Sequence, residues 1–312
     1  MKVCSLFCGI GGIDLAFEQA GHKIVWANDI DKFSCKTYRH NFPNVNLVEA
    51  DIRSLDKSLI PDCDIVTAGF PCQSFSVCGR QKGFNDERGN LFFEVGKVID
   101  AKQPKMVFLE NVANLTEHDN GKTFNIIHNE LAGRGYYIRY IIADVCDYGI
   151  PQHRTRTYII AFKDKLSCDG FCFPEKVPLE NHLTDIIETS KRADERYYYI
   201  RDTPKYERLN KAITDNRQLY RFSDWGIQSS KAGIAFTLKA NMGTYPNRVP
   251  IIKDDFGIRN ITPVECLALQ GFPQSFAIPD TVPEQEQYKQ AGNTVCIEII
   301  LKMIKPNFRE QL

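Results

Sequence analysis

The residue of this sequence best suited to covalent chemistry is Cys72, which follows the segment D64-I-V-T-A-G-F-P71. Residues 65–68 are apolar and mostly β-branched, which predicts a short buried strand. Gly69 and Pro71 end that strand, and Pro71 fixes its own φ, so Cys72 is expected on stiff backbone. Open α/β sheets place their reactive groups just past the carboxyl ends of strands. The sequence therefore predicts a nucleophilic thiol rather than a cysteine that only packs.

A carboxyl group is expected at the end of the next buried strand. The run K105-M-V-F-L-E-N-V112 is apolar until it reaches Glu110 and Asn111. A carboxyl group beside a nucleophile can act as a general acid. A solvated strand-end glutamate has the same pattern, so Glu110 is a candidate that needs a partner.

Two arginines follow in D147-Y-G-I-P-Q-H-R-T-R-T157. Gln152, Arg154 and Arg156 alternate at the start of an expected strand, and alternate residues share one face of a strand. Polar groups on a buried strand need a polar partner or a ligand. This segment is therefore expected to face the same site as Cys72.

The elements that position these residues begin at the N-terminus. Residues 2–7 predict a strand, and F7-C-G-I-G-G-I-D14 predicts a glycine-rich turn that enters an amphipathic helix. This order is typical of mononucleotide binding. The turn is not the G-x-G-x-x-G of dinucleotide sites, because its third glycine is Gly12.

Acidic residues follow the next two strands. The strand at 23–27 leads to Asp29, which is placed to hold two ribose hydroxyls, and to Ile30, which is placed to pack on an adenine. A third strand near 45–48 leads to Asp51, a candidate acceptor for the adenine amino group. The fold class is therefore α/β with a Rossmann-like sheet.

The rest of the chain predicts a smaller second domain. A polar, glycine-containing loop at 77–90 carries Arg80, Lys82 and Arg88, which are expected to meet phosphates when the loop closes. From about Phe171 the alternation of strand and helix stops, and irregular strands and loops are expected. At 259–273 a capping box of Thr262 and Glu265, with Pro263 at the first helical position, predicts a helix start.

Composition narrows the class of protein. At 312 residues, with 43% hydrophobic and 25% charged residues, the chain is expected to be globular with two domains. We find no apolar run of the roughly 18 residues that span a bilayer and no export signal, so a cytoplasmic location and no membrane contact are expected. The eleven cysteines lack a paired CxxC, which predicts reduced thiols and no metal site.

Charge is distributed unevenly although the formal net charge is zero. Residues 191–259 contain 14 Lys and Arg against 8 Asp and Glu, and the remainder contains 25 against 31. A basic segment in an otherwise acidic chain is typical of a phosphate-facing surface, although an ordinary solvated surface fits charge alone equally well.

Six blocks in register make the chain resemble the cytosine-C5 DNA methyltransferases of bacterial restriction-modification systems. The blocks are F7-C-G-I-G-G12, G69-F-P-C-Q-S-F-S76, E110-N-V112, Q152-H-R-T-R156, residues 259–273 and G292-N-T-V295. The resemblance implies a class I S-adenosylmethionine-dependent methyltransferase domain at 1–172 and 288–312. It also implies a loop-rich target-recognition domain at 173–287, with 259–273 bridging the two.

The resemblance also implies roles for single residues. Cys72 is the expected nucleophile, Glu110 the contact to cytosine N3 and the exocyclic amine, Arg154 the contact to O2, and Arg156 a support of the site. Thr237 matches the family's Thr-Leu pair in the DNA-binding domain. Residues at the family's S-adenosylmethionine positions are Phe7, Gly9, Ile10, Gly11, Asp29, Ile30, Asp51, Ile52, Pro71, Leu91, Asn293 and Val295.

The partners that the resemblance implies are double-stranded DNA and a cognate restriction endonuclease that acts separately, with the methyltransferase a monomer. Three alternatives remain. A tRNA cytosine-C5 methyltransferase shares the catalytic blocks but carries Cys-Phe-Thr where this chain reads A235-F-T237. A nicotinamide-dependent dehydrogenase leaves Pro71-Cys72 unexplained, and a non-catalytic DNA-binding protein leaves the intact catalytic set unexplained.

Overall fold

The structure, a computed structural model, describes residues 1–71, 91–180 and 182–307. The chain divides into two compact units. The first unit comprises residues 1–144, 155–175 and 299–312, and the second comprises 145–154 and 176–298. The expected boundary at 172 lies close to this division. Residues 145–154 and 288–298, which were expected in the first domain, are grouped with the second unit.

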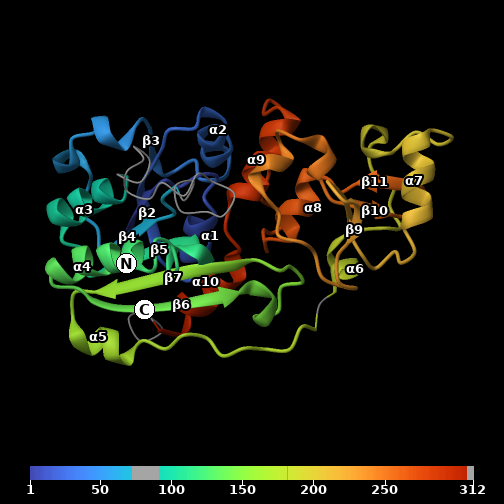
Figure 1. The fold of residues 1–312 in the computed structure, drawn as a ribbon. Helices are drawn as coiled ribbons and strands as arrows, with labels where there is room; N and C mark the ends of the chain where they lie inside the picture. Colours follow the sequence, from blue (N-terminus) through green and yellow to red (C-terminus); the bar gives the residue numbers. More distant parts are fainter. Residues whose placement is uncertain (72–90, 181, 308–312) are drawn as a thin grey trace. The chain divides into compact units, whose positions relative to one another are not determined.

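The first unit is built on a seven-stranded sheet of order β3-β2-β1-β4-β5-β7-β6. β7 runs antiparallel to both of its neighbours, β5 and β6, and Figure 1 shows it beside β6 at the edge of the sheet. The strands are β1 Lys2–Leu6, β2 Lys23–Asp29, β3 Asn46–Glu49, β4 Ile65–Ala68, β5 Met106–Val112, β6 Tyr137–Asp144 and β7 Thr155–Phe162.

Helices cover both faces of this sheet, so β4 is buried along its whole length and β5 along all but its last residue. One face, with Leu6 of β1 and Val66 of β4, packs against helices α3 and α4. On the other face Phe108 of β5 meets Phe17 of α1 edge to face, with ring centroids 5.4 Å apart. The helices of this unit are α1 Gly12–Gln19, α2 Lys32–Asn41, α3 Leu91–Lys102, α4 Lys122–Gly133 and α5 Lys165–Gly170, and most of α10 Ile297–Ile304.

The second unit contains a four-stranded antiparallel sheet of order β11-β10-β8-β9. Its strands are short, which is why the sequence predicted only irregular strands. The elements are α6 Leu183–Ile186, α7 Pro204–Ala212, β8 Tyr220–Ser223, β9 Gly226–Ser229, β10 Ile251–Lys253, β11 Ile258–Asn260, α8 Pro263–Ala268 and α9 Glu284–Asn293.

A buried ion network joins β11 to α8 in the second unit. The Arg259 guanidinium contacts Asp254 at 2.6 Å and Glu265 at 2.8 Å. Glu265 also forms the predicted capping box with Thr262, and Pro263 opens the helix. Because Arg259 is neutralised inside the unit, it adds nothing to the surface charge of the basic segment.

All the cysteines that the structure describes are free, and Cys4, Cys35, Cys266 and Cys296 are buried while Cys146 is half-buried. Across the described residues, every helix is too short or too polar to cross a membrane.

Candidate active site

The carboxyl ends of β4 and β5 lie side by side and bring Glu110 to the turn that follows β4. A Cβ atom added at Gly69 would lie 4.0 Å from Glu110 Oε2, an ordinary van der Waals distance, so the carboxyl group lies next to this turn. The neighbouring Asn111 donates from Nδ2 to the carbonyl of Phe70 at 3.2 Å and fixes the turn. The chain therefore reaches Pro71 beside Glu110. Cys72, the next residue, lies outside the described residues.

Glu110 and Arg156 form a pair at the centre of this site. Arg156 Nε lies 3.1 Å from Glu110 Oε1, and both side chains are largely buried. This contact is an ion pair without hydrogen-bond geometry, because Oε1 has no hydrogen-bond donor among the residues that the structure describes. A buried oxygen that lacks a donor is where a ligand or a proton is expected. Arg156 is itself braced by a 2.8 Å bond from Nη1 to the carbonyl of Thr155.

Arg154 has different surroundings from those that the sequence predicted. Only 2% of the residue is exposed, and its guanidinium donates to the backbone carbonyls of Leu238, Gly292 and Thr294 in the second unit. Gln152 is also buried there and donates to the carbonyl of Leu269. β7 begins only at Thr155, so the predicted common strand face of the three residues does not form.

The glycine-rich turn after β1 leaves an open space next to its backbone. Phe7, Gly9 and Gly11 all have positive φ, and a Cβ atom added at Gly9 would meet nothing within 4 Å. At Gly11 a Cβ atom would lie 2.3 Å from the ring of Phe42, so glycine is required there for packing. Gly11 is thus required for close packing, whereas Gly9 leaves the space next to the turn open.

Asp29 holds this turn. Its carboxylate accepts from the amide of Gly9 at 2.8 Å and from the amide of Asp31 at 2.8 Å. Burial raises the pKa of Asp29, and the two amides act against that shift. The side chain of Ile30 next to it is an exposed apolar group, with 65% of its surface accessible. A carboxylate beside an exposed aliphatic side chain fits the predicted ribose and adenine contacts.

The remaining residues expected at the cofactor differ in their surroundings. The Asp51 carboxylate is held by Arg53, whose Nη2 lies 2.6 Å away, and hydrogen bonds from Arg53 lower the pKa of Asp51. Phe7 and Leu91 are half-buried against the core, and Pro71 is also half-buried. Ile10 and Ile52 are buried in the first unit, whereas in the second unit Asn293 is exposed and Val295 is buried.

Asp14, which no sequence pattern singled out, lies in the first turn of α1, directly after the glycine-rich segment. Its Oδ2 accepts a 2.6 Å hydrogen bond from the hydroxyl of Tyr38 in α2. Burial raises the pKa of Asp14 to about 6. Asp31 was missed as well: it caps α2 by accepting from the amides of Phe33 and Ser34, and the segment N28-D-I-D31 carried that signal.

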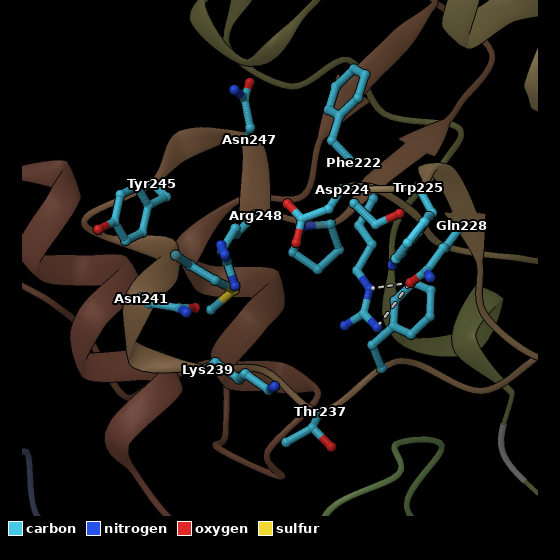
Figure 2. A pocket seen from close by; sticks show the side chains of 15 residues that line it. Phe222, Asp224, Trp225, Gln228, Thr237, Lys239, Asn241, Tyr245, Asn247 and Arg248 are labelled. Carbon is cyan, nitrogen blue, oxygen red and sulfur yellow. Dashed lines mark hydrogen bonds between the residues drawn. The ribbon is translucent and has the colours of Figure 1, made fainter. Parts of the chain in front are cut away.

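The residues predicted to bind DNA fall into two groups. Arg80, Lys82 and Arg88 lie outside the described residues. Thr237 lines a hollow of about 520 Å³ in the second unit, which Figure 2 shows from close by. The exposed Trp225 at the β8–β9 hairpin lines the same hollow.

Fold and site together define a class of protein: a Rossmann-like methyltransferase domain with a carboxyl-arginine pair at a strand end. The model of the family described as C-5 cytosine-specific DNA methylase matches residues 1–308. The chain is 42% identical to Type II methyltransferase M.Bsp6I of Bacillus sp. (strain RFL6), over all of both chains. It is 35% identical to Type II methyltransferase M.HhaI of Haemophilus parahaemolyticus, over 96% of this chain and 92% of that one.

Solved structures agree with the fold. A mutant of DNMT2 from Spodoptera frugiperda superposes with a TM-score of 0.77 at 22% identity, over 99% of each chain. A putative DNA modification methyltransferase from a prophage of E. coli superposes with a TM-score of 0.73 at 22% identity, likewise over 99% of each chain.

The chain therefore belongs to the C-5 cytosine-specific DNA methylase family. It is a DNA (cytosine-5)-methyltransferase of the Type II restriction-modification kind.

Proposed function

We propose that the enzyme methylates C5 of a cytosine flipped out of a specific duplex DNA sequence, through a covalent bond between Cys72 and C6. Cytosine C5 is a poor nucleophile on its own. Addition of a thiolate to C6 turns C5 into an enamine carbon that can attack an electrophile. At neutral pH a free cysteine is only a few per cent thiolate, so the site must favour the anion.

Glu110 relieves the charge that builds on the ring during this addition. The observation that carries the proposal is its buried Oε1, which lacks a hydrogen-bond donor among the described residues, in a carboxyl group whose Oε2 lies beside the turn leading to Cys72. When this carboxyl group carries a proton, it can donate to cytosine N3. After methyl transfer, a base such as water accepts the C5 proton, the electron pair of that C–H bond reforms the C5–C6 double bond, and Cys72 leaves as the thiolate.

Between the two arginines, we assign the O2 contact to Arg156 and a supporting role to Arg154. This reverses the roles expected from the sequence. Arg156 lies against Glu110, and its Nη2 has no hydrogen-bond partner among the described residues. The guanidinium of Arg154 is instead engaged with backbone carbonyls, so a substrate contact would require it to give up those bonds.

The glycine-rich turn fits S-adenosylmethionine. The free space at Gly9, the carboxylate of Asp29 and the exposed Ile30 form a surface for its methionine end, ribose and adenine. Asp51 accepts a hydrogen bond from the adenine amino group. The further expected contacts are Phe7, Pro71, Leu91, Asn293 and Val295. When bound, this molecule supplies the methyl group as an electrophilic methylsulfonium. Gly9 and Asp29 orient it, and no metal enters the scheme.

The base must leave the duplex before Cys72 can reach it, at a cost of a few kcal/mol. We propose that contacts of the second unit and of Arg80, Lys82 and Arg88 with phosphates offset this cost. The enzyme would act as a monomer in a bacterial cytoplasm, with a restriction endonuclease of the same specificity working separately.

Bisulfite sequencing of duplex DNA treated with the purified enzyme and S-adenosylmethionine tests the proposal. We expect 5-methylcytosine at one position of one short motif. Incubation with tRNA under the same conditions is the matched comparison, because the tRNA-directed branch shares this scaffold. Methylation of tRNA without methylation of DNA would contradict the assignment.

A further inference from the structure

The hollow in the second unit carries more positive than negative charge. Among the residues that line it, Arg221, Lys239 and Arg248 are basic and Asp224 alone is acidic. The hollow is formed by the β8–β9 hairpin and by residues 236–250 (Figure 2). A concave surface with this balance suits a ligand that is anionic or rich in hydrogen-bond acceptors.

Arg221 is held in a fixed orientation in this hollow. It lies directly opposite Gln228 in the β8–β9 pair, and Gln228 Oε1 accepts from its Nε at 3.4 Å and its Nη2 at 3.2 Å. Figure 2 marks these two bonds as dashed lines. The guanidinium carbon lies 4.2 Å from the centroid of the Phe236 ring. The amide fixes one edge of the guanidinium, and the ring supports its plane.

The contacts of Arg221 leave its charge without compensation. Within the described part of the chain, no carboxylate pairs with it and no acceptor meets Nη1. Burial, and then the charge of Arg248, lower the pKa of Arg221. Arg217, on the same unit, is instead neutralised by Asp215 at 2.9 Å. The guanidinium of Arg221 is thus oriented, its Nη1 has no acceptor among the described residues, and burial disfavours its charge. These features indicate that a ligand with two adjacent acceptors binds there.

We propose that Arg221 reads a guanine of the DNA target by donating from Nη1 and Nη2 to its O6 and N7 atoms. Guanine is the base that presents two adjacent acceptors in the major groove, at a spacing that matches the end of the arginine fork. Gln228 is then a positioning residue, because it turns that end outward. This inference rests on the proposed DNA substrate and names one determinant of its sequence.

A phosphate would also accept from a guanidinium, so the test must separate the two ligands. Lysine keeps the charge that a phosphate needs but lacks the planar fork, so it holds O6 and N7 of guanine less specifically. The experiment selects duplexes from a randomised pool by binding to the wild-type enzyme, to Arg221→Lys and to the control Arg217→Ala, and sequences the bound fraction. The bound fraction is then incubated with S-adenosylmethionine, and bisulfite treatment reads methylation separately.

We expect Arg221→Lys to lose about 5- to 150-fold of the preference for guanine at one position and to keep the preference elsewhere. Arg217→Ala should select the wild-type motif. A duplex with 7-deazaguanine at that position lacks N7 and should bind the wild type more weakly than the unmodified duplex does. Arg221→Lys should bind the two duplexes with equal affinity.

Two results would overturn the assignment: an unchanged motif for Arg221→Lys, or a loss of affinity that is the same for all sequences. A bound fraction without 5-methylcytosine for the wild type would instead refute the proposed reaction. The binding readout on Arg221 would still stand in that case, because it does not depend on turnover.

Discussion

At the level of single residues, the chemistry depends on which groups are already satisfied within the protein. Glu110 and Arg154 are both buried, yet Nη1 and Nη2 of Arg154 donate to three backbone carbonyls whereas Glu110 Oε1 has no donor among the described residues. A buried group without a partner costs free energy, and it is retained where a ligand supplies the partner. This contrast separates a group that acts on substrate from one that supports the fold.

Replacing Glu110 by Gln keeps the size of the side chain and removes its acidic proton. We expect the turnover number to fall by about 10²- to 10⁴-fold, because proton donation by a positioned side chain contributes rate of that order. The affinity for S-adenosylmethionine, measured by calorimetry, should change by less than about threefold. Equal losses in turnover and cofactor affinity would contradict the role of Glu110 at the base.

The two arginines provide a matched pair of variants. Arg156→Lys should lower the turnover number about 10- to 100-fold with little change in melting temperature, because lysine lacks the fork that reaches both Glu110 and the base. Arg154→Lys should lower the free energy of unfolding by about 2 kcal/mol or more, because a single ammonium cannot serve the same buried carbonyls. If Arg154→Lys instead lowered turnover and Arg156→Lys lowered stability, Arg154 would be the contact to O2, as the sequence suggested.

At the scale of elements, the sequence predicted the first unit well because hydrophobic patterns repeat over whole strands and helices. Strand β4, Ile65–Ala68, spans the predicted residues. The capping box of Thr262 was also confirmed, since it depends on neighbours in the chain. The start of β7 was wrong by three residues, because the carbonyls that bind Arg154 come from segments more than 80 positions away in the chain. Contacts of that range leave no local pattern.

A pH effect on stability is expected where α1 meets α2. The pKa of Asp14 is raised to about 6 from an ordinary value of 3.8, so between these values the folded chain holds a proton that the unfolded chain has lost. Folding stability from this group therefore falls as the pH rises from about 4 to 7. Chemical unfolding across this range should show a fall on the order of 2 kcal/mol in the wild type relative to Asp14→Asn. Identical pH profiles for the two proteins would contradict the buried, proton-binding role of Asp14.

At the scale of the whole molecule, the uneven charge matters more than the zero total. Residues 191–259 are basic and belong to the second unit, which also carries the hollow with Arg221. The sequence predicted this asymmetry. It did not predict the hollow, since Arg221, Gln228 and Phe236 meet only when the β8–β9 hairpin and the segment after it have folded. The positive charge of Arg259, in the same segment, is buried and paired with Asp254.

Salt concentration should change the affinity for DNA much more than the affinity for S-adenosylmethionine. Raising monovalent salt from 50 to 200 mM should weaken binding of a cognate duplex by about 100-fold or more, because counterions released from phosphates drive such binding. The affinity for S-adenosylmethionine should stay within about twofold, since its pocket neutralises no phosphates. Fluorescence anisotropy for DNA and calorimetry for the cofactor provide the measurements. A DNA affinity that does not depend on salt would contradict the proposal that the basic second unit contacts DNA phosphates.

The central claim, a transient bond between Cys72 and cytosine C6, is tested most directly by trapping that bond. A duplex with 5-fluorocytosine at the target position blocks the last step, because fluorine cannot leave C5 as the proton does. With S-adenosylmethionine present, mass spectrometry of the wild-type enzyme should find the methylated DNA strand attached to the peptide containing Cys72, and Cys72→Ser should bind the duplex without forming the adduct. An enzyme that methylates ordinary DNA but gives no adduct, or an adduct on another cysteine, would contradict the mechanism.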